Sequence, residues 1–249
     1  MVESYSALAP RYDELMADVD YIGYADFYER LINEYAPSVP RKLVDLGCGT
    51  GSVSVLMAKK GFEVCGIDIS CEMLTAAYKK AADEHAKIIF AEQDMTKLDC
   101  GSGWGAVICS FDGMNYLKDT KELKECFLRS AQALDDGGMF VFDVNTKYKY
   151  ENVIGGNTFV YELDDVMLIW QNFYRKNAGI CDFYLTFFEK DGGSWKRTDE
   201  YQRQKMFSDR TIIKLIEECG FELIKTCSDI SGAPVEKTSE RIFYICRKK

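Results

Sequence analysis

The chain has 249 residues, of which 47% are hydrophobic and 29% are charged, so its size and composition fit one α/β domain with an insertion better than two independent domains. The net charge of −9 argues against a nucleic-acid partner, because phosphate binding needs clustered lysine and arginine side chains. No apolar stretch approaches the roughly 20 residues of a membrane span. Ten cysteines without a Cys-x-x-Cys pair, beside the single histidine His85, do not indicate a zinc site.

The N-terminal residues 1–5 lack the basic region and the apolar run of a signal peptide. Many cysteines without an export signal are typical of proteins in the reducing cytoplasm. We therefore expect a cytoplasmic protein, monomeric or homodimeric, with no nucleic-acid partner, no membrane partner and no metal.

Two helices are expected before the first strand. Residues 5–17 predict a polar, aromatic helical segment, and residues 24–35 predict a second helix closed by Pro37 and Pro40. The periodicity then changes. Residues 42–46 predict a short apolar strand, a glycine-rich turn follows, and a helix over 52–60 ends at Gly61.

An alternation of strands and helices occupies the middle of the chain. Strands are predicted at 62–68, 87–91, 105–111 and 138–144, and helices at 70–82 and 120–134. Ser70 is placed to cap the first helix, while Asp119 and Glu122 stand three apart as a capping pair for the second. This alternation predicts right-handed βαβ units and a doubly wound sheet.

The alternation stops over 157–206, which carries no helix signal and predicts three or four antiparallel strands with turns at 176–179 and 191–193. Aromatic side chains there alternate as one sheet face would, and that face can pack on the domain, line a substrate pocket or pair two subunits. They include Phe173, Tyr174, Phe183, Tyr184, Phe187, Phe188 and Tyr201. The α/β pattern resumes with a helix that Ser208 caps and Gly220 ends. Residues 221–228 and 241–246 predict a terminal antiparallel pair.

The most informative segment is residues 45–51, with the sequence DLGCGTG, where a strand runs into a Gly-x-Gly-x-Gly loop and a helix follows. Glycines let the backbone turn sharply and let a ligand lie against main-chain N–H groups. Dinucleotide-binding loops read Gly-x-Gly-x-x-Gly and hold a pyrophosphate at the helix N-terminus. Here the third glycine comes one residue early. Asp45 would repel a pyrophosphate, but it suits the ammonium and sulfonium charges of S-adenosylmethionine (SAM).

Two further acidic residues follow strands. Asp68 ends the second strand, 17 residues past Gly51, near the position where dinucleotide folds bind a ribose diol. A carboxylate can accept both diol hydrogens, and Ser70 already supplies the helix cap that Asp68 would otherwise provide. Asp94 follows the third strand, where it can accept from an adenine amine while Met95 packs on the ring.

With these residues the chain resembles the class I SAM-dependent methyltransferases over about 41–145 and 207–247. Within that class it is similar to the bacterial small-molecule branch, which includes glycine/sarcosine and amino-sugar N-methyltransferases. The resemblance implies SAM as cofactor. It also implies an α/β fold with a doubly wound, seven-stranded, Rossmann-like sheet, a terminal antiparallel strand and an antiparallel β insertion.

The resemblance further implies that three parts of the chain have different roles. Residues 1–40 would form an N-terminal helical lid that contains Tyr12 and Asp13. Residues 41–145 and 207–249 would form the SAM-binding core, and 146–206 an antiparallel insertion that covers the substrate. The implied cofactor site consists of Tyr12, Asp45, Gly47, Cys48, Gly49, Asp68, Ile69, Met73, Asp94, Met95 and Phe111.

The loop after the fourth strand, residues 110–116, faces the methyl group in that family. It departs from the Asn/Asp-Pro-Pro-Tyr loop of enzymes that methylate amides and nucleobase amines, which disfavours such substrates. Asp112, Asn115 and Tyr116 are candidates for holding the acceptor, and each can instead be a capping or packing residue. Tyr12, Asp112 and Asn115 are the predicted catalytic residues, with Tyr12 near the sulfonium.

The expected activity is methyl transfer from SAM to a nitrogen or oxygen of a small-molecule acceptor. Such an in-line displacement needs orientation and a dry pocket, and a general base matters more for a hydroxyl than for a neutral amine. One alternative is a methyltransferase that acts on protein or RNA, of which the acidic composition disfavours RNA. Another is a SAM-binding sensor without transfer activity. The fold does not fix the acceptor.

Overall fold

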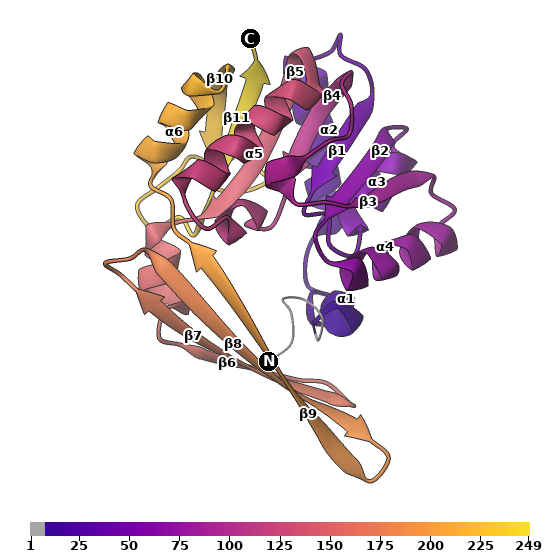
Figure 1. Ribbon diagram of the computed structural model, residues 1–249, viewed down its shortest axis with the longest axis vertical. Helices are drawn as coiled ribbons and strands as arrows, with labels where there is room; N and C mark the ends of the chain where they lie inside the picture. The colour runs from indigo at the N-terminus through magenta and orange to yellow at the C-terminus, as the bar shows by residue number, and fades with distance from the viewer. Residues whose placement is uncertain (1–7) are drawn as a thin grey trace.

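The computed structural model describes residues 8–249, and a seven-stranded sheet with helices on both faces lies at its centre (Figure 1). The strand order is β10-β11-β5-β4-β1-β2-β3; β1 to β5 are parallel, and β11 runs antiparallel to both β5 and β10. This confirms the predicted doubly wound sheet and its terminal antiparallel strand. The strands are β1 (Lys42–Leu46), β2 (Glu63–Asp68), β3 (Ile88–Glu92), β4 (Trp104–Cys109), β5 (Leu134–Asn145), β10 (Phe221–Cys227) and β11 (Arg241–Lys248).

Alternation along the strands builds two cores, one on each face of the sheet. Val107 and Phe140 belong to the core under α5 and α6, whereas Ala106 and Met139 belong to the core under α2 and α3. Because successive side chains of a strand point to opposite faces, these apolar strands serve both layers at once. The helices are α2 (Tyr21–Tyr35), α3 (Ser52–Lys59), α4 (Cys71–Asp83), α5 (Thr120–Ala133) and α6 (Asp209–Glu218).

Side-chain caps fix where the helices begin. Ser70 accepts the N–H of Met73 at the start of α4, and Ser208 caps α6 in the same way, as predicted. Asp119 caps α5, but Glu122 accepts the N–H of Lys118 instead of that of Asp119. α2 begins three residues earlier than predicted, because Asp20 accepts the N–H of Gly23.

The insertion forms a separate four-stranded antiparallel sheet in the order β6-β7-β8-β9. Its strands are β6 (Thr158–Glu162), β7 (Val166–Arg175), β8 (Ile180–Asp191) and β9 (Ser194–Lys205). Figure 1 shows it in orange, projecting from one end of the seven-stranded sheet. A short π-helix, Lys149–Ile154, leads into it from β5, and the sequence did not predict this turn.

The aromatic residues of the insertion are divided between its two faces, contrary to the single aromatic face that the sequence suggested. Phe183 and Phe187 are buried in the core of this sheet, which also contains Tyr150 and Leu168. Tyr184, by contrast, is 40% exposed on the opposite face. Neighbouring residues of a strand point to opposite sides, so aromatic pairs such as Phe183 and Tyr184 must separate.

The N-terminal segment is shorter as a helix than predicted. A 3-10 turn, Ala9–Arg11, precedes α1 (Tyr12–Leu15), and Pro10 at its start cannot donate a helical hydrogen bond. Residues 5–7 of the predicted helix lie outside the described residues. Within residues 8–249, no helix is both long and apolar enough to cross a membrane.

Candidate functional site

The glycine loop after β1 has the left-handed backbone that its sequence demands. The φ angles are +65° at Gly47, +55° at Gly49 and +75° at Gly51, a region that residues with a side chain rarely adopt. A Cβ at Gly51 would lie 3.0 Å from the Cβ of Ala77 in α4, whereas one at Gly49 would meet nothing within 4 Å. Gly51 therefore allows close packing, and Gly49 leaves open space above the loop.

That open space is a cavity of about 410 Å³ at the carboxyl ends of the central strands. Parallel strands deliver the residues that follow them to one edge, which is where α/β sheets bind ligands. The structure brings all the residues predicted for the cofactor to this cavity: Tyr12, Asp45, Gly47, Cys48, Gly49, Asp68, Ile69, Met73, Asp94, Met95 and Phe111.

Asp45 lines the cavity yet is only 2% exposed. The hydroxyl of Ser54 donates to its Oδ2 at 2.5 Å. Burial raises the pKa of Asp45 to about 7, and the Ser54 hydrogen bond partly offsets that rise. Among residues 8–249 no basic side chain forms an ion pair with Asp45, so a positively charged group of a ligand can bind there.

Asp68 is held by main-chain donors. Its Oδ2 accepts the N–H of Gly49 at 2.8 Å, and its Oδ1 accepts that of Ser70 at 2.9 Å. Burial raises the pKa of Asp68, while these two bonds lower it. Each oxygen keeps acceptor capacity, so a fixed carboxylate with two sites faces the cavity.

Asp94 is the third acidic residue of the cavity. Its Oδ1 accepts from both the N–H and the hydroxyl of Thr96, at 2.9 and 2.8 Å. These two bonds fix the carboxylate at the turn after β3. They leave Oδ2 able to accept hydrogen bonds from other donors.

A second cavity of about 400 Å³ adjoins the first. The N-terminal segment, the loop after β4 and the insertion sheet all contribute to its wall. The residues that line both cavities are Tyr12, Phe111, Tyr116 and Gln202. These four side chains therefore mark the place where molecules bound in the two cavities would meet.

The loop between β4 and α5 is strained at this junction. Phe111 and Asp112 both have φ of +55°, which is uncommon for residues with a side chain. The ring of Phe111 packs on Tyr24 at a centroid distance of 4.5 Å, and the N–H of Asp112 donates to Asp143 at 2.8 Å. Packing and hydrogen bonding thus hold a backbone shape that the loop alone would not favour.

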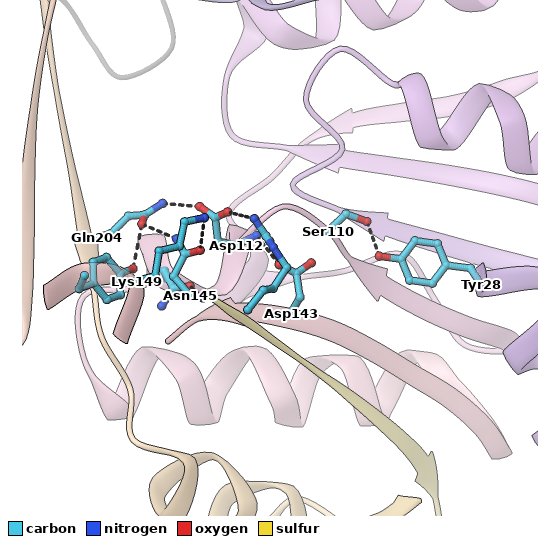
Figure 2. A network of polar contacts seen from close by, with 10 residues as sticks. Tyr28, Ser110, Asp112, Asp143, Asn145, Lys149 and Gln204 are labelled. Atoms are coloured by element: carbon cyan, nitrogen blue, oxygen red, sulfur yellow. Dashed lines mark hydrogen bonds and ion pairs between the residues drawn. The ribbon is translucent and has the colours of Figure 1, made fainter. Parts of the chain in front are cut away.

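Asp112 belongs to the polar network of Figure 2 and lines the second cavity. Arg241 donates to its Oδ1 at 2.8 Å and also pairs with the buried Asp143. Gln204 donates to its Oδ2 at 2.6 Å. Both carboxylate oxygens are engaged, so Asp112 is arranged to hold the loop rather than to take a proton.

Asn115 takes a different position from the one that its sequence suggested. It is fully buried, and it is not among the residues that line either cavity. Its amide donates to the carbonyl of Lys205 at 2.8 Å, and its oxygen accepts the N–H of Asn145 at 2.9 Å. Asn115 therefore ties the loop to the ends of β5 and β9.

The N-terminal segment is fastened at both ends of the site. Asp13 accepts from the hydroxyl of Thr50 at 2.6 Å and pairs with Lys80 of α4 at 2.8 Å. Arg11 pairs with Asp165 at 2.9 Å and with Glu189 at 3.3 Å, both in the insertion. These contacts hold Tyr12, which lies between Arg11 and Asp13, over the junction of the cavities.

Sequence reasoning missed several of these residues. Gln202, Gln204 and Arg241 line the second cavity, and Lys80 pairs with Asp13 of the N-terminal segment. One signal was available: Glu200, Gln202 and Gln204 alternate along β9 and are all nearly buried. Polar side chains that recur at every second residue of a strand can lie on its buried face. Tyr201, which the sequence analysis singled out, lies between them and therefore points to the opposite face.

Comparison with known proteins identifies the family. The profile of the methyltransferase domain matches residues 43–138. YqeM of Bacillus subtilis, assigned as a methyltransferase, is 32% identical over 98% of this chain and 97% of its own length. The crystal structure of an S-adenosylmethionine-dependent methyltransferase from Clostridium acetobutylicum is 32% identical, with a TM-score of 0.88 and 98% of each chain covered. The chain belongs to the SAM-dependent methyltransferases.

A third relative of this methyltransferase is more distant. The dTDP-3-amino-3,4,6-trideoxy-alpha-D-glucopyranose N,N-dimethyltransferase of Streptomyces venezuelae is 30% identical over 50% of this chain and 50% of its own. The chain thus spans about half the length of that sugar enzyme, while it matches YqeM almost from end to end.

The groups that line the first cavity fit the parts of SAM. Open space lies over Gly49, a fixed carboxylate at Asp68 suits a ribose diol, and Met73 and Met95 are apolar residues suited to the adenine ring. A buried carboxylate at Asp45 suits the ammonium group. SAM is the cofactor of the methyltransferase, and the residues present fit it. Among residues 8–249 no group of three metal-ligand side chains gathers.

Replacing Asp68 by alanine is expected to weaken SAM binding by about 1 to 3 kcal/mol, or roughly 5- to 150-fold, because a ribose diol bound at Asp68 would lose its acceptor. Titration calorimetry with SAM measures this. Asp83→Ala, at the exposed end of α4, the helix that follows β2 and Asp68, is the control and should bind SAM as the parent does. An unchanged SAM affinity in Asp68→Ala would remove Asp68 from the ribose.

Proposed function

We propose that this methyltransferase transfers the methyl group of SAM to a nitrogen or oxygen of a small molecule that binds in the second cavity. One observation carries the proposal: Tyr12, Phe111, Tyr116 and Gln202 line both cavities, so the two bound molecules would share a wall. On this reading residues 1–40 act as a lid, residues 41–145 and 207–249 as the SAM-binding core, and residues 146–206 as a cover over the acceptor.

We assign the cofactor contacts residue by residue. Asp45 pairs with the ammonium, Asp68 holds the ribose diol, and Oδ2 of Asp94 accepts from the adenine amine. The other predicted cofactor residues surround these contacts as apolar or main-chain wall: Gly47, Cys48, Gly49, Ile69, Met73, Met95 and Phe111. The geometry of the three carboxylates supports these assignments, because each is fixed by a hydrogen bond from its own neighbourhood.

When bound, SAM supplies a methyl group on a positively charged sulfur that a nucleophile attacks in line. The protein's part is to orient the two molecules and to exclude water. Burial raises the pKa of Tyr12 well above its ordinary value, so the hydroxyl stays protonated and can act as a donor at the junction. The hydroxyl of Tyr116 donates to Gln202 at 2.8 Å and ties the loop to the insertion.

We assign Asp112 and Asn115 to positioning rather than to proton transfer. Arg241 and Gln204 occupy the oxygens of Asp112, and backbone groups occupy the amide of Asn115. Neutral amines need no general base, so this arrangement favours nitrogen as the accepting atom. The names of sugar N-methyltransferases among its distant structural neighbours agree with that choice.

The shape of the second cavity favours a small molecule over a protein or RNA. It lies beneath the N-terminal segment and against the insertion sheet, and its volume of about 400 Å³ is in the range of cofactor and drug-sized sites. The net charge of −9 further disfavours RNA. The alternative from another class is a SAM-binding sensor. It differs from an enzyme in that it binds SAM without forming the demethylated cofactor.

A screen of the purified protein with methyl-labelled SAM against a metabolite library tests the proposal. We expect label in a small-molecule product and accumulation of the demethylated cofactor in equal amount. Label found only in protein or RNA from a cell extract would replace the proposed acceptor class. SAM binding without any demethylated product would favour the sensor.

Once an acceptor is found, Phe183→Leu is expected to raise its KM or lower kcat by about threefold to tenfold and to leave SAM affinity unchanged, because Phe183 lines the second cavity only. Tyr184→Leu is the matched control, since the next residue of β8 points to the exposed face. Steady-state kinetics and sedimentation measure the two effects. A change in mass without a change in kinetics would make the sheet a dimer face instead of a cover.

A further inference from the structure

The second cavity is mostly apolar. Leu15 and Met16 line it from the lid, and Leu168, Trp170 and Phe183 line it from the insertion sheet. The rings of Trp170 and Phe183 meet edge to face, with centroids 5.4 Å apart. A small polar acceptor would leave this wall in contact with water, whereas a flat apolar body would cover it.

The polar end of the same cavity has one positive group without an acidic partner. Lys149 is half-buried, and its Nζ donates to Oδ1 of Asn145 at 3.0 Å (Figure 2). Among residues 8–249, no carboxylate lies within ion-pair distance of it. Arg241, the other cation of this cavity, is already paired with Asp112 and Asp143.

Lys149 is held in place rather than free to turn to solvent. Asn145 accepts from it and donates to Gln204 at 3.1 Å, and Gln204 in turn donates to Asp112 at 2.6 Å. A half-buried ammonium fixed in this way, without a counter-charge, is stabilised by any anion that enters the cavity.

A buried donor without a partner lines the apolar side. The indole N–H of Trp170 is buried and has no hydrogen-bond partner among the described residues. Buried donors are nearly always satisfied in folded proteins, so an oxygen of a bound molecule is its natural partner. Asp112 offers no equivalent site for a cation, because Arg241 and Gln204 engage its two oxygens.

We infer that the acceptor is an organic acid with a flat, apolar body, whose anionic group binds Lys149 and whose rings lie against Trp170 and Phe183. The inference rests on the proposed function, since it takes the second cavity as the acceptor site. It separates this enzyme's acceptor from a bare amino acid such as glycine, which has too little apolar surface to cover the wall.

A pair of fluorescent probes tests the inference without knowledge of the acceptor. 1-Anilinonaphthalene-8-sulfonate and N-phenyl-1-naphthylamine share the same rings, and only the first carries a sulfonate. The full chain is titrated with each in saturating S-adenosylhomocysteine, which keeps the first cavity filled. We expect both to bind and the sulfonate to bind more tightly.

Variants at Lys149 decide the role of its charge. Lys149→Met is expected to weaken the sulfonate about tenfold and to change the neutral probe less than twofold, and Lys149→Arg should restore most of the loss. Lys147→Met is the matched control two residues away, where the side chain is 61% exposed, and both probes should bind it as they bind the parent.

If Lys149→Met weakens the binding of both probes equally, or weakens neither, the inference that Lys149 binds an anionic group is wrong. Failure of both probes to bind a parent protein that still binds S-adenosylhomocysteine would overturn the apolar body. The proposed function fails separately: charge-dependent probe binding with no methyl transfer in the labelled screen would leave the ligand class standing and make the chain a binding protein.

Discussion

Removing residues 1–18 is expected to lower the rate of methyl transfer by about 100-fold or more while the seven-stranded core stays folded. The deleted segment places Tyr12 over the junction of the two cavities. Without it, water enters the site and the two bound molecules lose one shared wall, and both changes act on the transfer step. The deletion stops before Asp20, because that residue caps α2.

A single substitution can weaken the contacts that hold the lid while the lid itself stays in the chain. Lys80 holds Asp13 at 2.8 Å and Thr50 at 3.0 Å, so Lys80→Met loosens the lid without removing it. The pair is partly exposed, with 23% and 47% of the two side chains accessible, so its contribution is at most about 1 kcal/mol. SAM is therefore expected to dissociate about two- to fivefold faster, as measured by stopped flow.

Two controls keep the lid interpretation testable. Lys79→Met removes an exposed lysine from the same helix and should leave SAM dissociation unchanged. Circular dichroism and thermal melting report whether the truncated chain keeps its core. Full transfer activity in a folded deletion would refute the lid, and so would a Lys79 variant that behaves like the Lys80 variant.

The core of the fold was predictable because its signals are local. Apolar runs, helix caps and glycines give strand and helix bounds that lie within a few residues of those observed, as for β1 and α4. The three acidic residues Asp45, Asp68 and Asp94 lie within two residues of the carboxyl ends of β1, β2 and β3. A parallel sheet brings such residues to one edge, so their convergence on one cavity follows from topology.

The second cavity was not predictable in the same way, because its residues come from segments whose relative placement no local pattern specifies. Lys149 begins the π-helix after β5, Gln204 is the residue before the last of β9, and Arg241 begins β11. Each looks like an ordinary polar residue until the insertion folds back on the core. Asn115, by contrast, was predicted as a site residue but lines neither cavity. In the sequence, a loop asparagine that bonds only to backbone groups cannot be told from one that faces a ligand.

Asp45→Asn is expected to weaken SAM binding by about 1.5 to 3 kcal/mol and, at the same time, to stabilise the ligand-free protein above neutral pH. The first effect follows from losing the charge that, in the proposed site, pairs with the ammonium of SAM. The second follows from burial, which raises the pKa of Asp45 from 3.8 to about 7 in the folded chain.

The sign follows from proton linkage. Between the unfolded pKa and the folded pKa, the folded chain keeps a proton on Asp45 that the unfolded chain releases, so stability falls as pH rises through that window. By pH 8 the loss is complete, and the difference of about three pKa units sets its upper size near 4 kcal/mol. The amide of the Asp45→Asn variant cannot ionise, so that variant escapes this loss.

Urea denaturation of both proteins without ligand, at pH 5 and pH 8, measures the difference, and titration calorimetry measures SAM affinity. We expect the variant to gain stability relative to the parent as pH rises. Ser54→Ala is the companion variant: its hydroxyl lowers the pKa of Asp45, so its removal should move the sensitive window to higher pH. If the free energy of unfolding depends on pH in the same way for the parent and for Asp45→Asn, Asp45 stays ionised in the folded, ligand-free chain. That result would contradict the raised pKa of Asp45.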